Sequence, residues 1–191
     1  MNGQQNPPEH VALTFVGPIN YPATKFLRNA CCQAVNAGTK RLTLLISSNG
    51  GSTAEGFALY HFLRALPLET TMHNIGSIDS IANVCFLAGK NRFACANTRF
   101  MFHDLTWTYG QQETLDRDHM RERIQSLDSD AAQFLEIFKL HTSLTDDLFE
   151  TLKLLQQPSF ISPVKAKEFQ IINEITEANI PAGMPIYNIE F

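Results

Sequence analysis

A serine, a histidine and a pair of glycines are the residues of this chain whose types and positions suit nucleophilic chemistry. Ser80 stands in residues 76–82 (GSIDSIA), where an extended run changes into an apolar helical run. A serine at a sharp strand-to-helix junction projects its hydroxyl outward, and the helix N-terminus that follows favours negative charge. This position suits a nucleophile, although a serine that only caps the helix fits the local sequence better.

Two other segments carry the partners that such a serine needs. Gly50 and Gly51 follow an apolar run, either as an ordinary strand-to-helix turn or as a run of exposed backbone N–H groups that forms an oxyanion hole. His103 ends residues 100–103 (FMFH), where a histidine is most often a polar group satisfied by its neighbours. As a neutral imidazole near Ser80, it would act as a general base. Each segment is a weak signal alone. Whether the three form one site depends on the strands and helices that position them.

Short strands alternate with helices over the first half of the chain. Apolar patterns predict strands over residues 10–16, 42–46, 70–75, 92–96 and 99–102, and helices over residues 21–37, 53–66 and 81–88. This order predicts a right-handed α/β fold with a mainly parallel sheet. Sites in such folds form at the carboxyl ends of the strands, here the Gly50–Gly51 turn and a turn that Gly76 opens.

The pattern changes in the second half. Residues 113–141 read as one long helix with apolar residues at positions 120, 124, 127, 131, 134 and 138. We expect this helix to protrude and to pair with a partner chain, because it is too long for one face of a compact domain of this size. Shorter helices are predicted over residues 145–155 and 164–169. Residues 176–191 are either a strap on a neighbouring subunit or a loosely ordered tail, and residues 1–191 form a single domain.

Composition restricts the function classes. The 191 residues are 44% hydrophobic and carry 15 Lys and Arg against 19 Asp and Glu, without a basic cluster. This balance argues against nucleic-acid or membrane-surface binding, and the apolar runs are too short to span a bilayer. The polar N-terminus lacks a secretion segment, and four cysteines without a metal-binding or disulfide pattern indicate reduced thiols in the cytoplasm. The other histidines show no ligand spacing, so we expect no metal and no organic cofactor.

Taken together, residues 46–52 (ISSNGGS), 76–80 (GSIDS) and 99–103 (RFMFH) resemble motifs of the Clp protease proteolytic subunit family. The family reads approximately Ser-Pro-Gly-Gly-Ser, Gly-x-Ala-Ala-Ser-Met-Gly and Arg-x-Met-Ile-His-Gln-Pro at these places. The resemblance covers residues 11–175. It implies a ClpP/crotonase-like fold of repeated ββα units, with a long helix after residues 109–111 (YGQ) that interleaves with an opposing ring. By resemblance, Ser80 is the nucleophile, His103 is the base, and the N–H groups of Gly51 and Ile81 are the oxyanion donors.

The chain departs from the family pattern in ways that bear on activity. The position two residues before Phe160, which usually holds the triad aspartate, is Pro158. Losing that carboxylate costs orders of magnitude in rate unless Gln157 or a backbone carbonyl takes its place. Asp79 stands where the family has alanine and adds negative charge close to the expected oxyanion site.

The resemblance also implies partners. We expect homo-oligomeric rings, heptameric or tetradecameric, that act on peptides or unfolded proteins. Docking to an AAA+ unfoldase ATPase stays open, and the short segment before the first strand argues against it.

Three functions follow: a serine endopeptidase, a catalytically impaired pseudo-peptidase ring subunit that Pro158 would favour, and a crotonase-like acyl-CoA enzyme. The absence of a basic cluster for the CoA phosphates counts against the third function.

Overall fold

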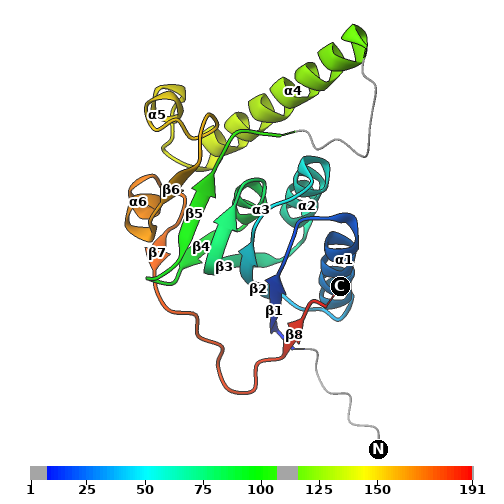
Figure 1. The fold of residues 1–191 in the computed structure, drawn as a ribbon. Coiled ribbons are helices and arrows are strands. Elements are labelled where there is room, and N and C mark those ends of the chain that lie inside the picture. Colours follow the sequence, from blue (N-terminus) through cyan, green and yellow to red (C-terminus); the bar gives the residue numbers. More distant parts are fainter. Residues whose placement is uncertain (1–7, 107–115, 191) are drawn as a thin grey trace, which may run out of the picture.

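The computed structural model describes residues 8–106 and 116–190, and these form one mixed sheet with helices packed against it (Figure 1). The strand order is β6-β5-β3-β2-β1-β8, with β4 pairing with β3 and β7 pairing with β4. Every pairing is parallel except that of β5 with β6. The predicted α/β class with a mainly parallel sheet is therefore confirmed.

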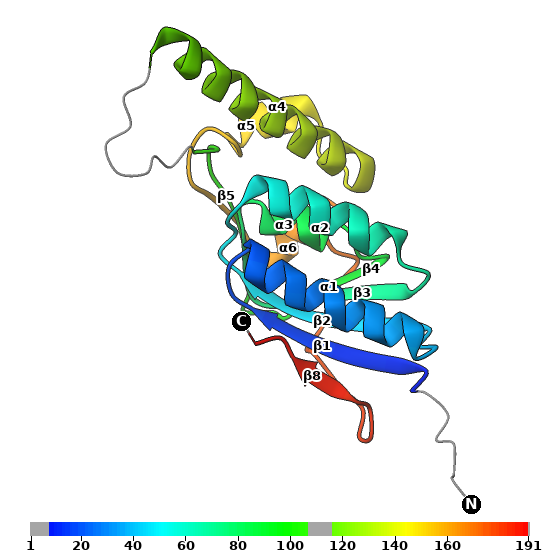
Figure 2. The same ribbon diagram turned by 90° about the vertical axis from the view of Figure 1, so that its right-hand side faces the viewer.

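The first half of the chain follows the predicted alternation of strands and helices. Its elements are β1 (His10–Val16), α1 (Tyr21–Asn36), β2 (Arg41–Ser48), α2 (Thr53–Ala65), β3 (Glu69–Asp79), α3 (Ala82–Phe86), β4 (Asn91–Ala94) and β5 (Arg99–Phe102). The helices α1, α2 and α3 lie on one face of the sheet (Figure 2). Alternate residues of the central strands, such as Leu44 and Ile46, point into the core under these helices and are about 1% exposed. Burial of these apolar side chains holds the carboxyl ends of β2, β3 and β5 together at one edge of the core.

The predicted turn at Gly76 is wrong, because β3 continues through this residue to Asp79. The strand changes partners here: up to Asn74 it pairs with β4, and from Ser77 it pairs with β5. A side chain at position 76 would place its Cβ 2.6 Å from Ser47 Oγ, so glycine is needed for the close approach of β2. Ser47 Oγ in turn accepts a hydrogen bond from the Ser77 N–H at 3.1 Å. Gly76 therefore marks an irregularity inside a strand, and the turn that ends the strand comes at Ser80.

The second half of the described chain contains the long helix that the sequence predicts. Its elements are α4 (Arg117–His141), α5 (Asp146–Thr151), β6 (Ser159–Ile161), α6 (Pro163–Glu168), β7 (Glu174–Ile175) and β8 (Ile186–Asn188). Asp116 caps α4, and the predicted start at residue 113 and the segment 109–111 lie outside the described residues. The N-terminal half of α4 projects away from the sheet (Figures 1 and 2). Its C-terminal half packs Phe134 and Phe138 against Phe102 of β5.

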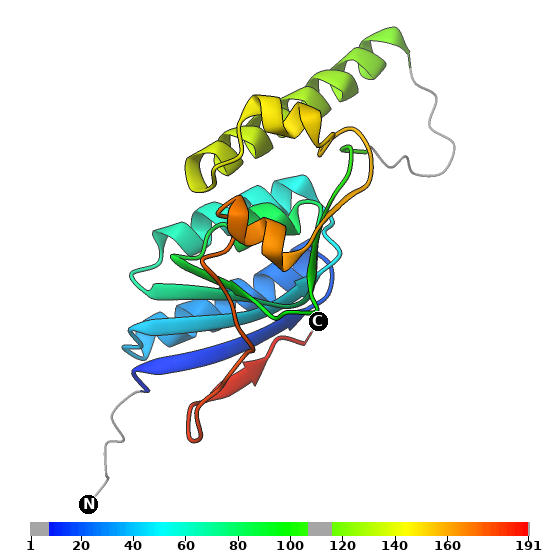
Figure 3. The same cartoon turned by 90° about the vertical axis from the view of Figure 1, so that its left-hand side faces the viewer.

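The C-terminal segment takes an arrangement that neither predicted alternative includes. After β7 it runs outside the sheet to the far edge (Figure 3), where β8 pairs in parallel with β1 through Ala12↔Ile186, Leu13↔Tyr187 and Thr14↔Asn188. The Ala12 N–H also donates to the Pro185 carbonyl at 2.9 Å. Residues 186–188 are therefore a strand of the chain's own sheet.

Polar contacts fix the C-terminal end of α4 to the body. Buried Arg92 on β4 donates hydrogen bonds to the backbone carbonyls of Gly89, His141, Gln170 and Ile171. The Tyr60 hydroxyl and His141 Nε2 share a hydrogen bond of 2.6 Å. Burial and the nearby Arg64 and Arg92 lower the pKa of His141 to about 4. His141 is therefore neutral in the folded protein at neutral pH.

This histidine should make stability depend on pH. The ordinary histidine pKa is 6.5, so between pH 6.5 and about 4 the unfolded chain binds a proton that the folded chain does not. The stabilisation is present above pH 6.5 and is lost as the pH falls toward 4. We expect the wild-type melting temperature to fall by about 2–4 °C more than that of His141→Gln across this range. Circular dichroism melts at several pH values measure the difference, and parallel curves for the two proteins would contradict it.

Candidate active site

Ser80 lies at the junction of β3 and α3 in an unusual backbone conformation. Its φ is 56°, in the left-handed region that non-glycine residues rarely adopt. The Ser80 N–H donates to the Met101 carbonyl at 2.9 Å, which holds the junction against β5. The cap position of α3 is Ile81, and no side-chain hydrogen bond caps this helix, so the interpretation of Ser80 as a helix-capping serine is wrong. The strained turn instead leaves the Ser80 side chain off the strand and ahead of the helix.

Asn83 was missed in the sequence and helps to hold this junction. It is about 1% exposed, and its Nδ2 donates to the carbonyls of Ser80 at 3.0 Å and Met101 at 2.9 Å. An amide inside the apolar run of residues 81–88 was the available signal, because a buried polar side chain must find partners. These two bonds tie the turn that carries Ser80 to the strand that precedes His103.

The Gly50–Gly51 turn packs directly on Ser80. Gly50 has a φ of 82°, and a Cβ built on it would lie 2.8 Å from both Ser80 Cβ and the Asp79 carbonyl oxygen. A Cβ on Gly51 would lie 2.3 Å from the Ile19 carbonyl oxygen. The N–H groups of Gly51 and Ile81 have no hydrogen-bond partner within residues 8–106 and 116–190. Two free backbone donors therefore flank Ser80, as an oxyanion hole requires.

Gly50→Ala should disturb this contact. The new methyl group would press on Ser80 Cβ, and alanine would be strained at a φ of 82°. We expect the free energy of unfolding to fall by about 1–3 kcal/mol and the reactivity of Ser80 toward a fluorophosphonate to fall at least about tenfold. Urea unfolding and labelling kinetics measure these effects. Gly183→Ala is the control, since Gly183 has a similar φ of 86° with open space around it. Equal loss of reactivity in both variants would contradict the expectation.

His103 follows the last residue of β5, beside the junction that carries Ser80. The ladder of β3 with β5 ends at Asp79↔Met101; Ser80 follows Asp79 directly, and His103 lies two residues after Met101. Within the described residues no hydrogen bond joins the Ser80 hydroxyl to the His103 ring, as is common in active sites without substrate. The His103 Nδ1–H donates to the Asp104 backbone carbonyl at 2.5 Å. This bond fixes the tautomer that leaves the Nε2 lone pair free to accept a proton.

Pro158 and His103 stand next to the paired ends of two neighbouring strands. The antiparallel ladder of β5 with β6 ends at Phe102↔Ser159, and His103 and Pro158 are the next residues beyond that pair. The position of Pro158 is therefore a candidate place for an orienting carboxylate. Of the two substitutes considered from the sequence, the described structure contains the backbone carbonyl, from Asp104, and no bond from Gln157 to His103.

The charge of Asp79 is balanced within the sheet. Asp79 Oδ2 lies 3.8 Å from Arg99 Nη2, and the Ser77 hydroxyl donates to Asp79 Oδ1. The carboxylate is therefore paired with a cation, and the expected electrostatic penalty at the oxyanion donors is reduced.

Comparison with known proteins decides the family. The Clp protease family model matches residues 19–179. This chain belongs to the Clp protease family. An ATP-dependent Clp protease proteolytic subunit from Bdellovibrio bacteriovorus is 26% identical over 145 residues, which are 73% of this chain and 65% of that protein. The chain thus spans about two thirds of the length of this curated relative.

The fold agrees with that family. A mutant form of ClpP1 from Listeria monocytogenes superposes with a TM-score of 0.75 and 18% identity, covering 89% of this chain and 92% of that structure. At this identity the likeness establishes the fold alone. The resemblance that the motifs indicated is confirmed, and the low identities mark a divergent Clp-family member.

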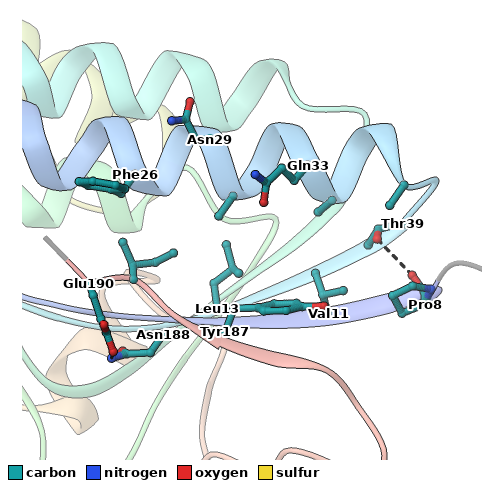
Figure 4. Close-up of a pocket in the computed structure, with 14 residues that line it drawn as sticks. Pro8, Val11, Leu13, Phe26, Asn29, Gln33, Thr39, Tyr187, Asn188 and Glu190 are labelled. Carbon is teal, nitrogen blue, oxygen red and sulfur yellow. Dashed lines mark hydrogen bonds between the residues drawn. The ribbon is translucent and has the colours of Figure 1, made fainter.

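One pocket of the described residues lies away from Ser80. This cavity of about 600 Å³ lies between α1, β1 and β8, with Phe26, Leu13 and Tyr187 among its walls (Figure 4). Its lining includes none of the predicted site residues. Ser80 and His103 of this Clp-family chain are half-buried and follow β3 and β5, two strands inside the sheet.

Within residues 8–106 and 116–190, no three histidine, cysteine or acidic side chains gather in a way that would hold a metal ion. None of the helices described there is both long and apolar enough to cross a bilayer.

Proposed function

We propose that this Clp-family chain is a serine endopeptidase with Ser80 as the nucleophile and His103 as the general base. The observation that carries the proposal is the contact of Ser80, at a φ of 56°, with a glycine turn flanked by two free N–H donors. Ser80 Oγ attacks the peptide carbonyl while His103 Nε2 takes its proton. The N–H groups of Gly51 and Ile81 bind the oxyanion, and the imidazolium returns the proton to the leaving amine. Water then hydrolyses the acyl-enzyme by the same base.

The orientation of His103 supports activity at a reduced rate. The Asp104 carbonyl holds the ring in the tautomer that a base needs. A neutral carbonyl offsets the charge of the imidazolium less than a carboxylate does, because only the carboxylate carries a full negative charge. We therefore infer slow acyl transfer, with the oxyanion donors supplying most of the rate enhancement.

Peptides and unfolded proteins are the proposed substrates, and rings of this chain are the proposed assembly. Membership of the Clp protease family supports both proposals. The projecting half of α4 exposes Met120 (47%) and Ile124 (58%), which suit contact with another subunit. Whether the ring is a heptamer or a tetradecamer, and whether an AAA+ ATPase docks on it, are questions for native mass spectrometry with and without that partner.

Labelling with a fluorophosphonate tests the chemical proposal. The probe phosphonylates only serines that a base and an oxyanion hole activate. We expect one adduct per chain, located on Ser80 by peptide mapping and absent after heat denaturation. An adduct on another serine, or none on a folded protein, would contradict the proposal.

A pseudo-peptidase is the second candidate, and the position of Pro158 favours it. Pro158 precedes Ser159, the partner of Phe102, and by the family resemblance this position would hold the orienting carboxylate. In that case the folded ring would neither react with the probe nor cleave peptides, and its role would lie in assembly with an active relative.

A further inference from the structure

A small ionic network lies on one face of β3 and β5, next to Ser80, and the proposed mechanism does not use it. Alternate residues Ser77 and Asp79 of β3 share a face with Arg99 of β5, because Ser77 pairs with Arg99. Arg99 Nε donates to Ser77 Oγ at 3.1 Å, and Arg99 Nη2 lies 3.8 Å from Asp79 Oδ2. The Asp79 side chain is 8% exposed, so it has exchanged most of its water for these partners.

Arg99 extends the network to a third strand. Its guanidinium lies over the Phe160 ring of β6, 5.2 Å from the centroid. The network therefore joins the strand that leads to Ser80, the strand that leads to His103 and the strand that follows Pro158. Between β3 and β5 the ladder has only the pairs Ser77↔Arg99, Ile78↔Phe100 and Asp79↔Met101. So short a ladder at the end of a sheet needs side-chain contacts to keep its two strand ends in register.

We propose that Asp79 and Arg99 are positioning residues that hold the strand bearing His103 against the strand bearing Ser80. The inference rests on the proposed function and adds residues to its site. In this chain the carboxylate that orients the base is missing, and the family motif has alanine where Asp79 stands. The Asp79–Arg99 pair compensates by fixing the backbone that carries both groups.

Rate is more sensitive to this alignment than binding is. Proton transfer from Ser80 to His103 needs a hydrogen bond of about 3 Å, and a displacement of about 1 Å at such a site lowers the rate about 10²-fold. The Asp79 and Arg99 side chains contact each other, Ser77 and the Phe160 ring, and the proposed mechanism assigns none of these groups to substrate binding. Loss of the pair should therefore lower kcat and leave KM nearly unchanged.

Asp79→Ala and Arg99→Met test the proposal in the full chain with a fluorogenic peptide. Each variant is expected to lower kcat about tenfold, with KM within about twofold of the wild-type value. The double variant is expected to lose no more than either single variant, because both remove the same interaction. Arg99→Lys, which keeps the charge, is expected to recover at least about half of the lost kcat. If Asp79→Ala fails to fold, Asp79→Asn replaces it.

Lys167→Met is the matched control, because it breaks the 2.6 Å Lys167–Glu174 ion pair between α6 and β7. We expect its kcat to stay at the wild-type value. An active wild type whose Asp79→Ala variant keeps kcat within twofold would overturn the positioning role and leave the proposed function intact. A wild type that neither reacts with the probe nor cleaves peptides would overturn both.

Discussion

Pro158→Asp is expected to raise kcat for peptide hydrolysis by about 10²–10⁴-fold. Pro158 precedes Ser159, which pairs with Phe102, and His103 follows Phe102, so we expect a carboxylate there to accept the Nδ1–H bond that the Asp104 carbonyl now accepts. A charged acceptor would both orient the ring and stabilise the imidazolium that forms when Ser80 attacks. Steady-state hydrolysis of a fluorogenic peptide measures the gain, with no change expected in oligomeric state.

Pro158→Asn is the control for this gain. Asparagine has nearly the shape of aspartate and can accept the same hydrogen bond, but it carries no charge. We expect Pro158→Asn to give at most a small part of the increase. If Pro158→Asp folds and cleaves no faster than the wild type, the inferred place of the missing carboxylate is incorrect. If an inert wild type becomes active through this single change, the pseudo-peptidase interpretation of the natural chain gains support.

Ser80→Ala is expected to lower peptide hydrolysis by about 10²-fold in the wild type and by about 10⁴–10⁶-fold in the Pro158→Asp background. The loss is smaller in the wild type because a base without its carboxylate activates Ser80 less, so Ser80 contributes less to the rate. Fluorophosphonate labelling should disappear in both backgrounds.

Ser126→Ala, on the projecting part of α4, is the control for that loss and is expected to behave as its parent. The experiment compares kcat/KM of the two parents and of their Ser80→Ala and Ser126→Ala variants at matched concentrations of assembled chain. If Ser80→Ala retains half of the parental activity in either background, the hydrolysis does not pass through this serine.

The order of the first five strands and three helices could be predicted from the sequence. Each of these segments buries one face or both, and the resulting apolar pattern is visible within the segment itself. Gly76 misled the prediction, since a glycine that permits the approach of Ser47 looks the same in sequence as one that opens a turn. The pairing of β8 with β1 could not be predicted, because three exposed residues at a chain end carry no pattern of their own.

The candidate site could also be predicted only in part. Ser80, His103 and the glycines were recognisable as types in short motifs, and the structure brings their strand ends together. The roles of the Asp104 carbonyl and of Arg99 were not recognisable, because one is a main-chain atom and the other depends on which residues face each other across two strands. Spatial neighbours of this kind leave no spacing signal in a single chain.

The placement of β8 also bears on solubility. The segment HVALTFV would otherwise be an open edge, with unpaired main-chain groups ready to extend the sheet into a neighbouring molecule. β8 covers part of that edge, so fewer main-chain groups of β1 stay open to pairing with a strand of another molecule.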